Sequence, residues 1–405
     1  MVCLCLMKKF VVNSWSSIVS MLRSPFLSLK IPTFSHGLTQ MHPAFQIKGR
    51  HTIHDDAVKM YKGMKKDIEV ELQNLDSHIF LTSDMWTSSQ DLGYMCITAH
   101  YINAEFNYKK KTISFAEVKY PHTGYAIEEE IVRCLTEWGI RSKLFTLTLD
   151  NASNNTNACE QLRKYYKHEL LLEDQHLHVR CCAHILNILV HDGMKIIHEA
   201  IDMIRELLKY IDSSPSRLQD FNTIASGMGL RSKKGISVDT LTRWNSTWKM
   251  LVEALTYLAS YANRKMIDSP SEEQWEKAKA ICEFLKAFEE LTLIVSAHRK
   301  PTSHKFLPVV LSIRHALKDP GWQTSDVLKE LAVAMQTKLD KYWDPEEKEN
   351  ADPNRRIKSK GIEFNHALVI ATFLDPRRKE DYLDFLYCKL STNEEQITKQ
   401  VEIAL

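Results

Sequence analysis

The sequence predicts an α/β fold, in which a mixed sheet with flanking helices is followed by a long helical region. Between residues 77 and 184, short β-branched and aromatic segments alternate with amphipathic helical segments. The middle third of the chain has helical periodicity only. The 405 residues, 44% hydrophobic and 26% charged, suit one large domain or two to three smaller ones.

Three strands are expected first along the chain. Residues 79–81 read as a buried strand that ends at Asp84, and Trp86 and a polar turn follow it. Residues 93–102 and 110–120 are rich in β-branched and aromatic side chains and are separated by a polar turn. They are therefore expected to form two further strands.

Two helices and two more strands are expected next. Residues 122–140 carry apolar side chains at helical spacing, and Gly139 ends this helix. Residues 143–149 alternate as a fourth strand, residues 154–166 form a second helix, and residues 176–182 form a fifth strand. The order is therefore three strands, helix, strand, helix, strand.

Asp84 and Asp150 follow the first and fourth predicted strands. If these strands are parallel neighbours, the two carboxylates meet at one edge of the sheet, where active sites of open α/β sheets lie. Two carboxylates repel each other unless a divalent cation lies between them, and oxygen ligands suit Mg²⁺ or Mn²⁺. The alternative is that both aspartates are turn or helix-capping residues.

Charge and cysteine usage limit the possible functions. The net charge is +2, so nucleic-acid binding must come from local basic patches. The nine cysteines are scattered, which favours a reducing compartment over a disulfide framework. No Cys-x₂-Cys is followed by paired histidines, so no zinc finger is detected.

The N-terminal residues 1–41 are expected to be a poorly structured leader. Their longest uncharged run, residues 10–22, is too short to span a bilayer, so no membrane association is expected. Lys8 and Lys9 before an apolar run imitate a secretory signal only weakly.

The middle of the chain is expected to form a bundle of helices. One helix opens with Ser271 and Gln274 at capping-box spacing. Residues 303–319 and 325–343 continue the helical pattern, and residues 344–361 form a charged loop.

Six motifs occur in an order that resembles the hAT superfamily of transposases, in particular its plant zinc-finger BED, RICESLEEPER-like branch. They are TSDMWTSSQDLGYMCITAHYI, PHTGYAIEEEIVRCLTEWGI, TLTLDNASNNTNA, HVRCCAHILNILVHDG, LTRWNSTWKML and LVIATFLDPRRK. The resemblance implies an RNase H-like core, with a mixed five-stranded sheet, interrupted by a large all-helical insertion. It also implies nuclear action on DNA.

The resemblance assigns roles to five residues. The family's catalytic triad is Asp, Asp, Glu, and its first two members correspond to Asp84 and Asp150. His184 closes a motif that matches the family's Cys-x-x-His beside the active site. Arg243 and Trp244 match a pair that meets DNA, where Arg grips phosphate and Trp stacks on an unpaired base. The alternative for this pair is a surface Arg beside a core Trp.

Zinc is a further alternative for the segment that contains His184. His176, His178, Cys181 and Cys182 lie close by in the sequence, and zinc favours such ligands. Strand alternation, however, sends them to different faces, so a buried strand with a functional His184 at its end is expected.

Three departures from the family are expected to matter. The BED finger is missing, no stretch matches the motif of the third acid, and no dimerisation region is recognised. A monomer, or hetero-association with fuller family members, is therefore expected. The acids Glu128 to Glu130, at the start of a predicted helix, are weak substitutes for the third acid. Asp375 lies in an Asp-Pro-Arg-Arg stretch that resembles a structural motif of the family and not its catalytic acid.

The sequence therefore predicts a transposase-derived nuclear protein that associates with DNA and is catalytically incomplete. One alternative is an active Mg²⁺-dependent DNA transposase completed by another subunit, and another is a protein-interaction scaffold without a DNA role. The expected parts are a leader (1–41), a helical pre-core segment (42–76), an RNase H-like core (77–184), a helical insertion (185–343), a charged loop (344–361) and a truncated helical segment that returns to the core (362–405).

Overall fold

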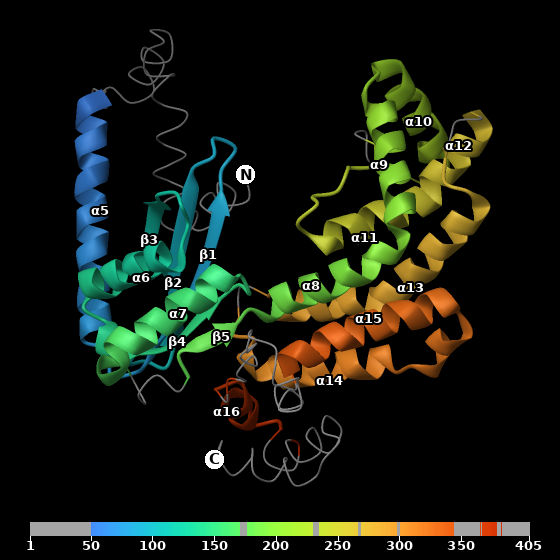
Figure 1. Ribbon diagram of the computed structural model, residues 1–405. Helices are drawn as coiled ribbons and strands as arrows, with labels where there is room; N and C mark the ends of the chain where they lie inside the picture. Colours follow the sequence, from blue (N-terminus) through green and yellow to red (C-terminus); the bar gives the residue numbers. More distant parts are fainter. Residues whose placement is uncertain are drawn as a thin grey trace. The chain divides into compact units, whose positions relative to one another are not determined.

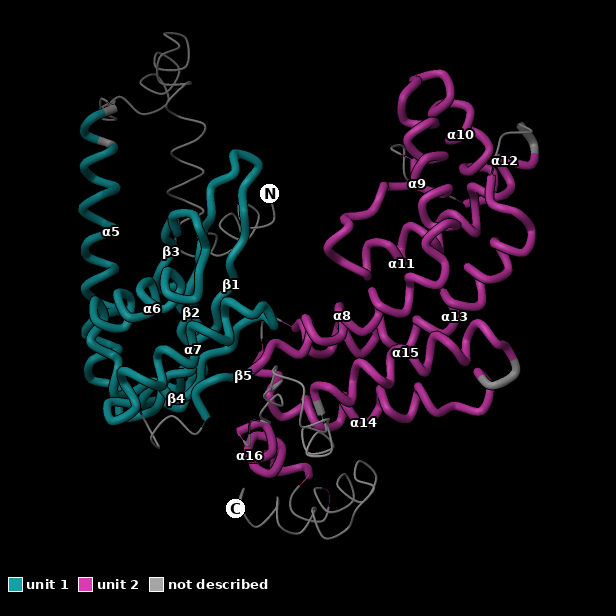
Figure 2. Tube along the Cα trace, in the orientation of Figure 1, with its two compact units in different colours: residues 1–179 teal, residues 180–405 magenta. Residues whose placement is uncertain are grey.

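A computed structural model describes residues 50–170, 176–229, 235–265, 269–297, 300–343, 365, 367–378 and 382. The predicted leader and the predicted charged loop lie outside these residues. The chain divides into two compact units, residues 1–179 and 180–405 (Figure 2).

The first unit is built on a five-stranded sheet with the order β3-β2-β1-β4-β5 (Figure 1). β1 and β2 are antiparallel, as are β2 and β3, whereas β1 and β4 are parallel. The expected parallel pairing of the first and fourth strands is thus confirmed. The strands are β1 (Ile79–Thr87), β2 (Gly93–Ile102), β3 (Tyr108–Val118), β4 (Leu144–Leu149) and β5 (His178–Arg180).

Side chains alternate between the two faces of this sheet, as the pleat requires. On one face, Ile79, Leu81 and Ile97 join a buried apolar cluster with residues of three helices. The intervening residues of β1, such as Phe80 and Asp84, lie on the other face and are exposed. The helices are α5 (Arg50–Gln73), α6 (Gly124–Trp138) and α7 (Ser153–Tyr166), of which α6 and α7 lie side by side (Figure 1).

Local chemistry explains where α6 begins and ends. The hydroxyl of Thr123 accepts a hydrogen bond from the Ala126 amide, 3.3 Å away, and so caps the first turn. Gly139 ends the helix in the left-handed conformation, with φ of 65°. The predicted end of this helix is therefore confirmed.

Two strands differ in length from the prediction. β1 does not end at Asp84, because its antiparallel pairing with β2 continues to Thr87 opposite Gly93. The fifth strand is short, because the backbone turns after Arg180 and a helix begins at Cys182.

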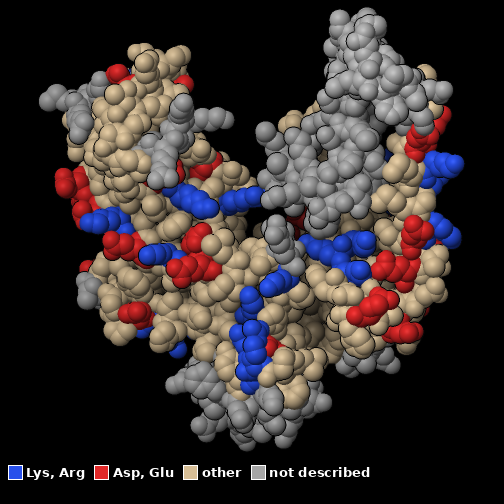
Figure 3. Space-filling model, turned by 180° about the vertical axis from the view of Figure 1, so that it is seen from behind, with Lys and Arg blue, Asp and Glu red and all other residues tan. Residues whose placement is uncertain are grey.

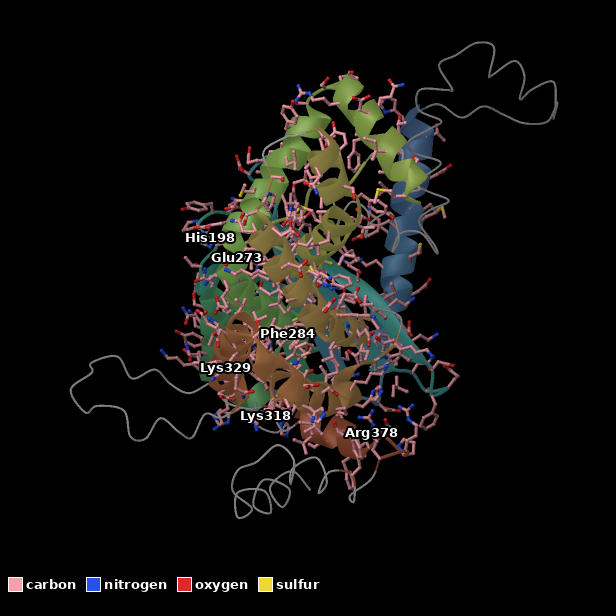
Figure 4. The ribbon with its side chains drawn as sticks, turned by 90° about the vertical axis from the view of Figure 1, so that its right-hand side faces the viewer. His198, Glu273, Phe284, Lys318, Lys329 and Arg378 are labelled. Carbon is pink, nitrogen blue, oxygen red and sulfur yellow. The ribbon has the colours of Figure 1, made fainter. Side chains whose placement is uncertain are left out.

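The second unit is helical in its described residues. Its main buried cluster includes Leu186, Trp244, Leu285 and Leu331. Phe284, labelled in Figure 4, belongs to the same cluster. The helices are α8 (Cys182–Met194), α9 (His198–Asp212), α10 (Pro215–Gly227), α11 (Trp244–Glu253), α12 (Ala259–Lys265), α13 (Glu272–Val295), α14 (Phe306–Leu317), α15 (Asp326–Trp343) and α16 (Ala367–Phe373).

Two sequence features shape this unit. The predicted capping box at the start of α13 is present, because Ser271 and Gln274 exchange both hydrogen bonds. Gly193 lets α8 approach α15 closely, since a Cβ at this position would lie 2.3 Å from the Leu331 Cδ1 atom. No helix in the described part of the chain is long and apolar enough to cross a membrane.

Candidate functional site

The strand register places Asp84 and Asp150 at matching positions. β1 and β4 pair in parallel as far as Thr82 and Thr148, and each aspartate follows its partner of this pair by two residues. Asp150 directly follows Leu149, the last residue of β4, so this register brings both aspartates toward the same end of two neighbouring parallel strands. Asp84 shares a face of β1 with Thr82, because alternate residues of a strand point the same way.

Asp150 is held firmly at the end of β4. Its Oδ1 atom accepts a hydrogen bond from the Ala152 amide at 2.8 Å and another from the Asn155 side-chain amide at 2.6 Å. Asn155 lies in the first turn of α7 and is only 6% exposed. Asp84 is exposed on β1 and pairs across the sheet with Cys96.

The strand β2 carries two titratable groups on the face of Asp84. Burial raises the pKa of the Cys96 thiol, and the negative charge of Asp84 adds to this, so the thiol stays protonated near neutral pH. Burial, and then the charge of Lys110, lower the pKa of His100 to about 4. The neutral His100 ring is within hydrogen-bond distance of the Thr82 hydroxyl (2.9 Å) and the Tyr108 hydroxyl (2.6 Å).

Trp86 lies on the same face, two residues beyond Asp84. Its ring contacts those of Tyr94 and Phe115, with centroids 5.9 and 5.6 Å away. The aromatic residue after Asp84 therefore packs across three strands, which is a structural role.

The oxygen chemistry of Asp84 and Asp150 fits Mg²⁺ or Mn²⁺. Mg²⁺ is commonly held by one or two carboxylates together with waters and substrate phosphates. No group of three His, Cys, Asp or Glu side chains able to hold a metal occurs among the described residues. The cluster around His178 and Cys181 thus provides no such group in that part of the chain.

The acids considered as a third ligand have other surroundings. Glu128 is buried in α6, and burial followed by the charge of Glu129 raises its pKa. Glu130 accepts hydrogen bonds from Arg133. In the second unit, Asp375 accepts two side-chain hydrogen bonds from Arg377, at 2.9 and 2.8 Å, which lower its pKa.

His184 does not lie at the end of a strand, as the sequence suggested. It occupies the first turn of α8, because Cys181 caps this helix and its carbonyl accepts hydrogen bonds from the amides of His184 and Ile185, at 3.1 and 3.0 Å. His184 is partly exposed.

Arg243 and Trp244 have opposite environments. Trp244 is fully buried in the helical core, so the prediction that its indole stacks on an unpaired base is wrong for this conformation. The reason is that α11 begins at Trp244 and turns it inward. Arg243 precedes the helix and is exposed.

Asn187 fixes the backbone on both sides of Arg243. Its side-chain oxygen accepts a hydrogen bond from the Trp244 amide at 3.1 Å, and its side-chain nitrogen donates one to the Thr242 carbonyl at 3.2 Å. Asn187 lies on α8, three residues after His184, so both share one side of that helix. Sequence reasoning missed Asn187, although it lies inside a motif used for the resemblance.

A buried ion pair supports the same loop. Asp239, whose side chain is fully buried, accepts hydrogen bonds from Arg205 at 2.9 and 2.7 Å and one from the Thr247 hydroxyl at 2.5 Å. The Ser246 hydroxyl accepts from the Thr240 amide at 2.9 Å. The segment that carries Arg243 is therefore anchored at both ends.

Comparison with known domain families agrees with this arrangement. The family described as ZBED1 RNase-like domain matches residues 82–177, and that described as ZBED1 RNase-like helical domain matches residues 179–284. A third family, described as hAT-like transposase, RNase-H fold, matches residues 304–405.

The chain therefore carries hAT-like transposase domains. It is 31% identical to zinc finger BED domain-containing protein RICESLEEPER 2 of Oryza sativa subsp. japonica, over 90% of this chain and 49% of that protein. The identity is 26% with DAYSLEEPER of Arabidopsis thaliana, over 90% of this chain and 51% of that protein.

A Zea mays protein that carries the name AC transposase is 31% identical, over 89% of this chain and 44% of that protein. The chain spans about half the length of these curated relatives. The predicted α/β fold with an RNase H-like core and a helical domain is thus confirmed.

Proposed function

We propose that this protein is a nuclear, transposase-derived protein that binds DNA. The contact is made by the loop that precedes α11 and carries Arg243, which is called the Arg243 loop below. The observation that carries the proposal is the position of Arg243, an exposed guanidinium between two residues whose backbones Asn187 holds. A guanidinium recognises phosphate with two parallel hydrogen bonds. A fixed backbone reduces the entropy lost when this contact forms.

The relatives support the same proposal. The name AC transposase denotes a protein that acts on DNA, and a similar fungal protein carries a name that denotes a transcriptional regulator. Lys and Arg side chains also gather in local groups on the face seen in Figure 3, although the net charge is only +2. Local basic groups are what DNA binding requires in a nearly neutral protein.

The test is the salt dependence of DNA binding by the whole chain, measured by fluorescence anisotropy. Phosphate contacts release counterions, so the logarithm of the affinity falls linearly with the logarithm of the salt concentration. Arg243→Ala should weaken binding and reduce the salt slope by about 1. Lys329→Ala, which removes an exposed charge on α15 (Figure 4), is the matched control and should change neither quantity. Equal effects of both variants would exclude a specific role of the Arg243 loop in DNA binding. No binding by the wild type would favour the alternative of a protein-interaction scaffold without a DNA role.

A second candidate function is Mg²⁺-dependent cleavage of DNA, with the third acid supplied elsewhere. The observation that favours it is the parallel pairing of β1 and β4, which brings Asp84 and Asp150 toward the same end of two neighbouring strands. Both residues would hold the cation, which would polarise the phosphate and activate the attacking water.

Nicking of a supercoiled plasmid distinguishes this enzyme from the catalytically incomplete protein. We expect no nicking by the chain alone with Mg²⁺ or Mn²⁺. Nicking by the wild type that disappears in both Asp84→Asn and Asp150→Asn would establish the enzyme instead.

A further inference from the structure

We propose that Asn155 is a positioning residue for Asp150, which turns its carboxylate so that the Oδ2 atom remains available to a divalent cation. The inference rests on the proposed cation site and adds a residue to it. It starts from the contact between the Asn155 side-chain nitrogen and the Asp150 Oδ1 atom, 2.6 Å apart.

Both side-chain hydrogen bonds of Asp150 within the described residues end on Oδ1. One donor is the Ala152 backbone amide and the other is the Asn155 side chain. A carboxylate oxygen has two lone pairs, so these donors occupy Oδ1. Among the described residues no hydrogen bond ends on Oδ2, so Oδ2 is the oxygen that suits a cation.

The two donors also prevent rotation of the carboxylate. The Ala152 amide alone forms a local turn, which leaves the plane of the carboxylate free to tilt. Asn155 donates from a second direction, because it lies in the first turn of α7. Its side chain is nearly buried, and a buried amide that lost this acceptor would leave a donor unpaired.

The helix that carries Asn155 is itself fixed. The neighbouring Asn154 side chain donates a hydrogen bond to the His122 carbonyl at 2.7 Å, before α6. Gly124 at the start of α6 packs so closely on α7 that an added Cβ would lie 2.7 Å from the Asn157 Cβ atom. The donor therefore has a set position relative to β4, as a residue that orients a metal ligand requires.

The experiment measures Mn²⁺ binding by the full chain without DNA, from the loss of the electron paramagnetic resonance signal of free Mn²⁺. Replacing a residue that orients a metal ligand typically lowers metal affinity about 10-fold to 100-fold. We expect a loss of this size for Asn155→Ala. Asn157→Ala is the matched control, because it shortens an exposed asparagine of the same helix and keeps its Cβ atom, and it should leave the affinity unchanged.

A double variant separates positioning from direct binding. If Asn155 acts through Asp150, then Asp150→Ala and Asp150→Ala/Asn155→Ala should bind Mn²⁺ equally weakly. Thermal melting followed by circular dichroism checks that the variants fold. If Asn155→Ala does not fold, Asn155→Ser replaces it, because the serine side chain is too short to reach Asp150.

Three results would overturn the inference. A normal Mn²⁺ affinity in the folded Asn155 variant would exclude the positioning role of Asn155 and leave the cation site itself in place. A further loss in the double variant would make Asn155 a ligand and not a positioning residue. A normal affinity in Asp150→Ala would reject the cation site itself, and DNA binding through Arg243 is unaffected by any of these results.

Discussion

Arg243 and Trp244 illustrate how adjacent residues of one motif can have separate roles. The helix α11 begins between them, so the indole enters the core and the guanidinium stays at the surface. The sequence offered both possibilities for Trp244, a base-stacking ring or a core ring. It did not decide between them, because the direction of a side chain depends on where the helix starts.

Substitutions of this pair should therefore differ in their effect on stability. Trp244→Ala should lower the free energy of unfolding by about 3 to 5 kcal/mol, because it leaves a cavity in the helical core. Arg243→Ala should change it by less than about 0.5 kcal/mol. Urea denaturation followed by circular dichroism measures both. Equal losses would mean that Arg243 also has a structural role.

His100 should make the protein less stable in mild acid. In the unfolded chain its pKa is near 6.5, whereas in the folded protein burial and Lys110 lower it to about 4. Between these pH values the unfolded state binds the extra proton, so its free energy falls relative to the folded state. The stabilisation is present above pH 6.5 and is lost as the pH falls toward 4, by up to about 1.4 kcal/mol per pH unit.

Denaturation curves at a series of pH values between 4 and 7 measure this effect. His100→Gln should flatten the dependence in that window. His198→Gln, at an exposed position at the start of α9 (Figure 4), should not. A steep slope that survives in His100→Gln would assign the acid sensitivity to other groups.

At the scale of elements, the sequence predicted most helices and strands but misplaced some of their ends. Periodicity and capping residues located α6, α7 and α13, since these signals are local. β1 extends beyond Asp84 because of hydrogen bonds to β2, and such pairing is not visible within the strand itself. His184 was expected at the end of a strand but lies in the first turn of α8, because β5 stops at Arg180 and the helix begins at Cys182.

Two glycines in helical regions should respond in opposite ways to alanine. Gly139→Ala should destabilise the protein by about 1 kcal/mol, because its φ of 65° is unfavourable for any residue with a Cβ. Gly63 lies inside α5 with open space around it, so Gly63→Ala should stabilise the protein by about 0.5 to 1 kcal/mol. Thermal melts compare the two, and a stabilising Gly139→Ala would contradict the assigned helix end.

At the scale of the molecule, the described residues include a buried apolar cluster in each of the two units. The sequence indicated a sheet part and a helical part from their different periodicities. It placed the boundary after His184, whereas the units divide after Val179. Propensity did not locate this boundary, because the division follows contacts between residues far apart in the sequence.

A protein of residues 180–405 should fold without the sheet. Its core contains Phe221, Leu251, Phe288 and many other buried side chains that belong to that unit alone. Circular dichroism should show a helical spectrum and a cooperative thermal transition. A non-cooperative melt would show that the helical unit depends on the first unit for its stability.

The alternation of side chains along β1 also determines where residues can be inserted or deleted. Because Ile79 and Leu81 point one way and Asp84 the other, deleting one residue between Leu81 and Asp84 would carry the carboxylate under the helices. The hairpin turn at residues 88–92 carries no such constraint, since it lies beyond both the aspartate and the last paired residue, Thr87. Natural insertions and deletions in this part of the fold should therefore accumulate in the turn and avoid the strand.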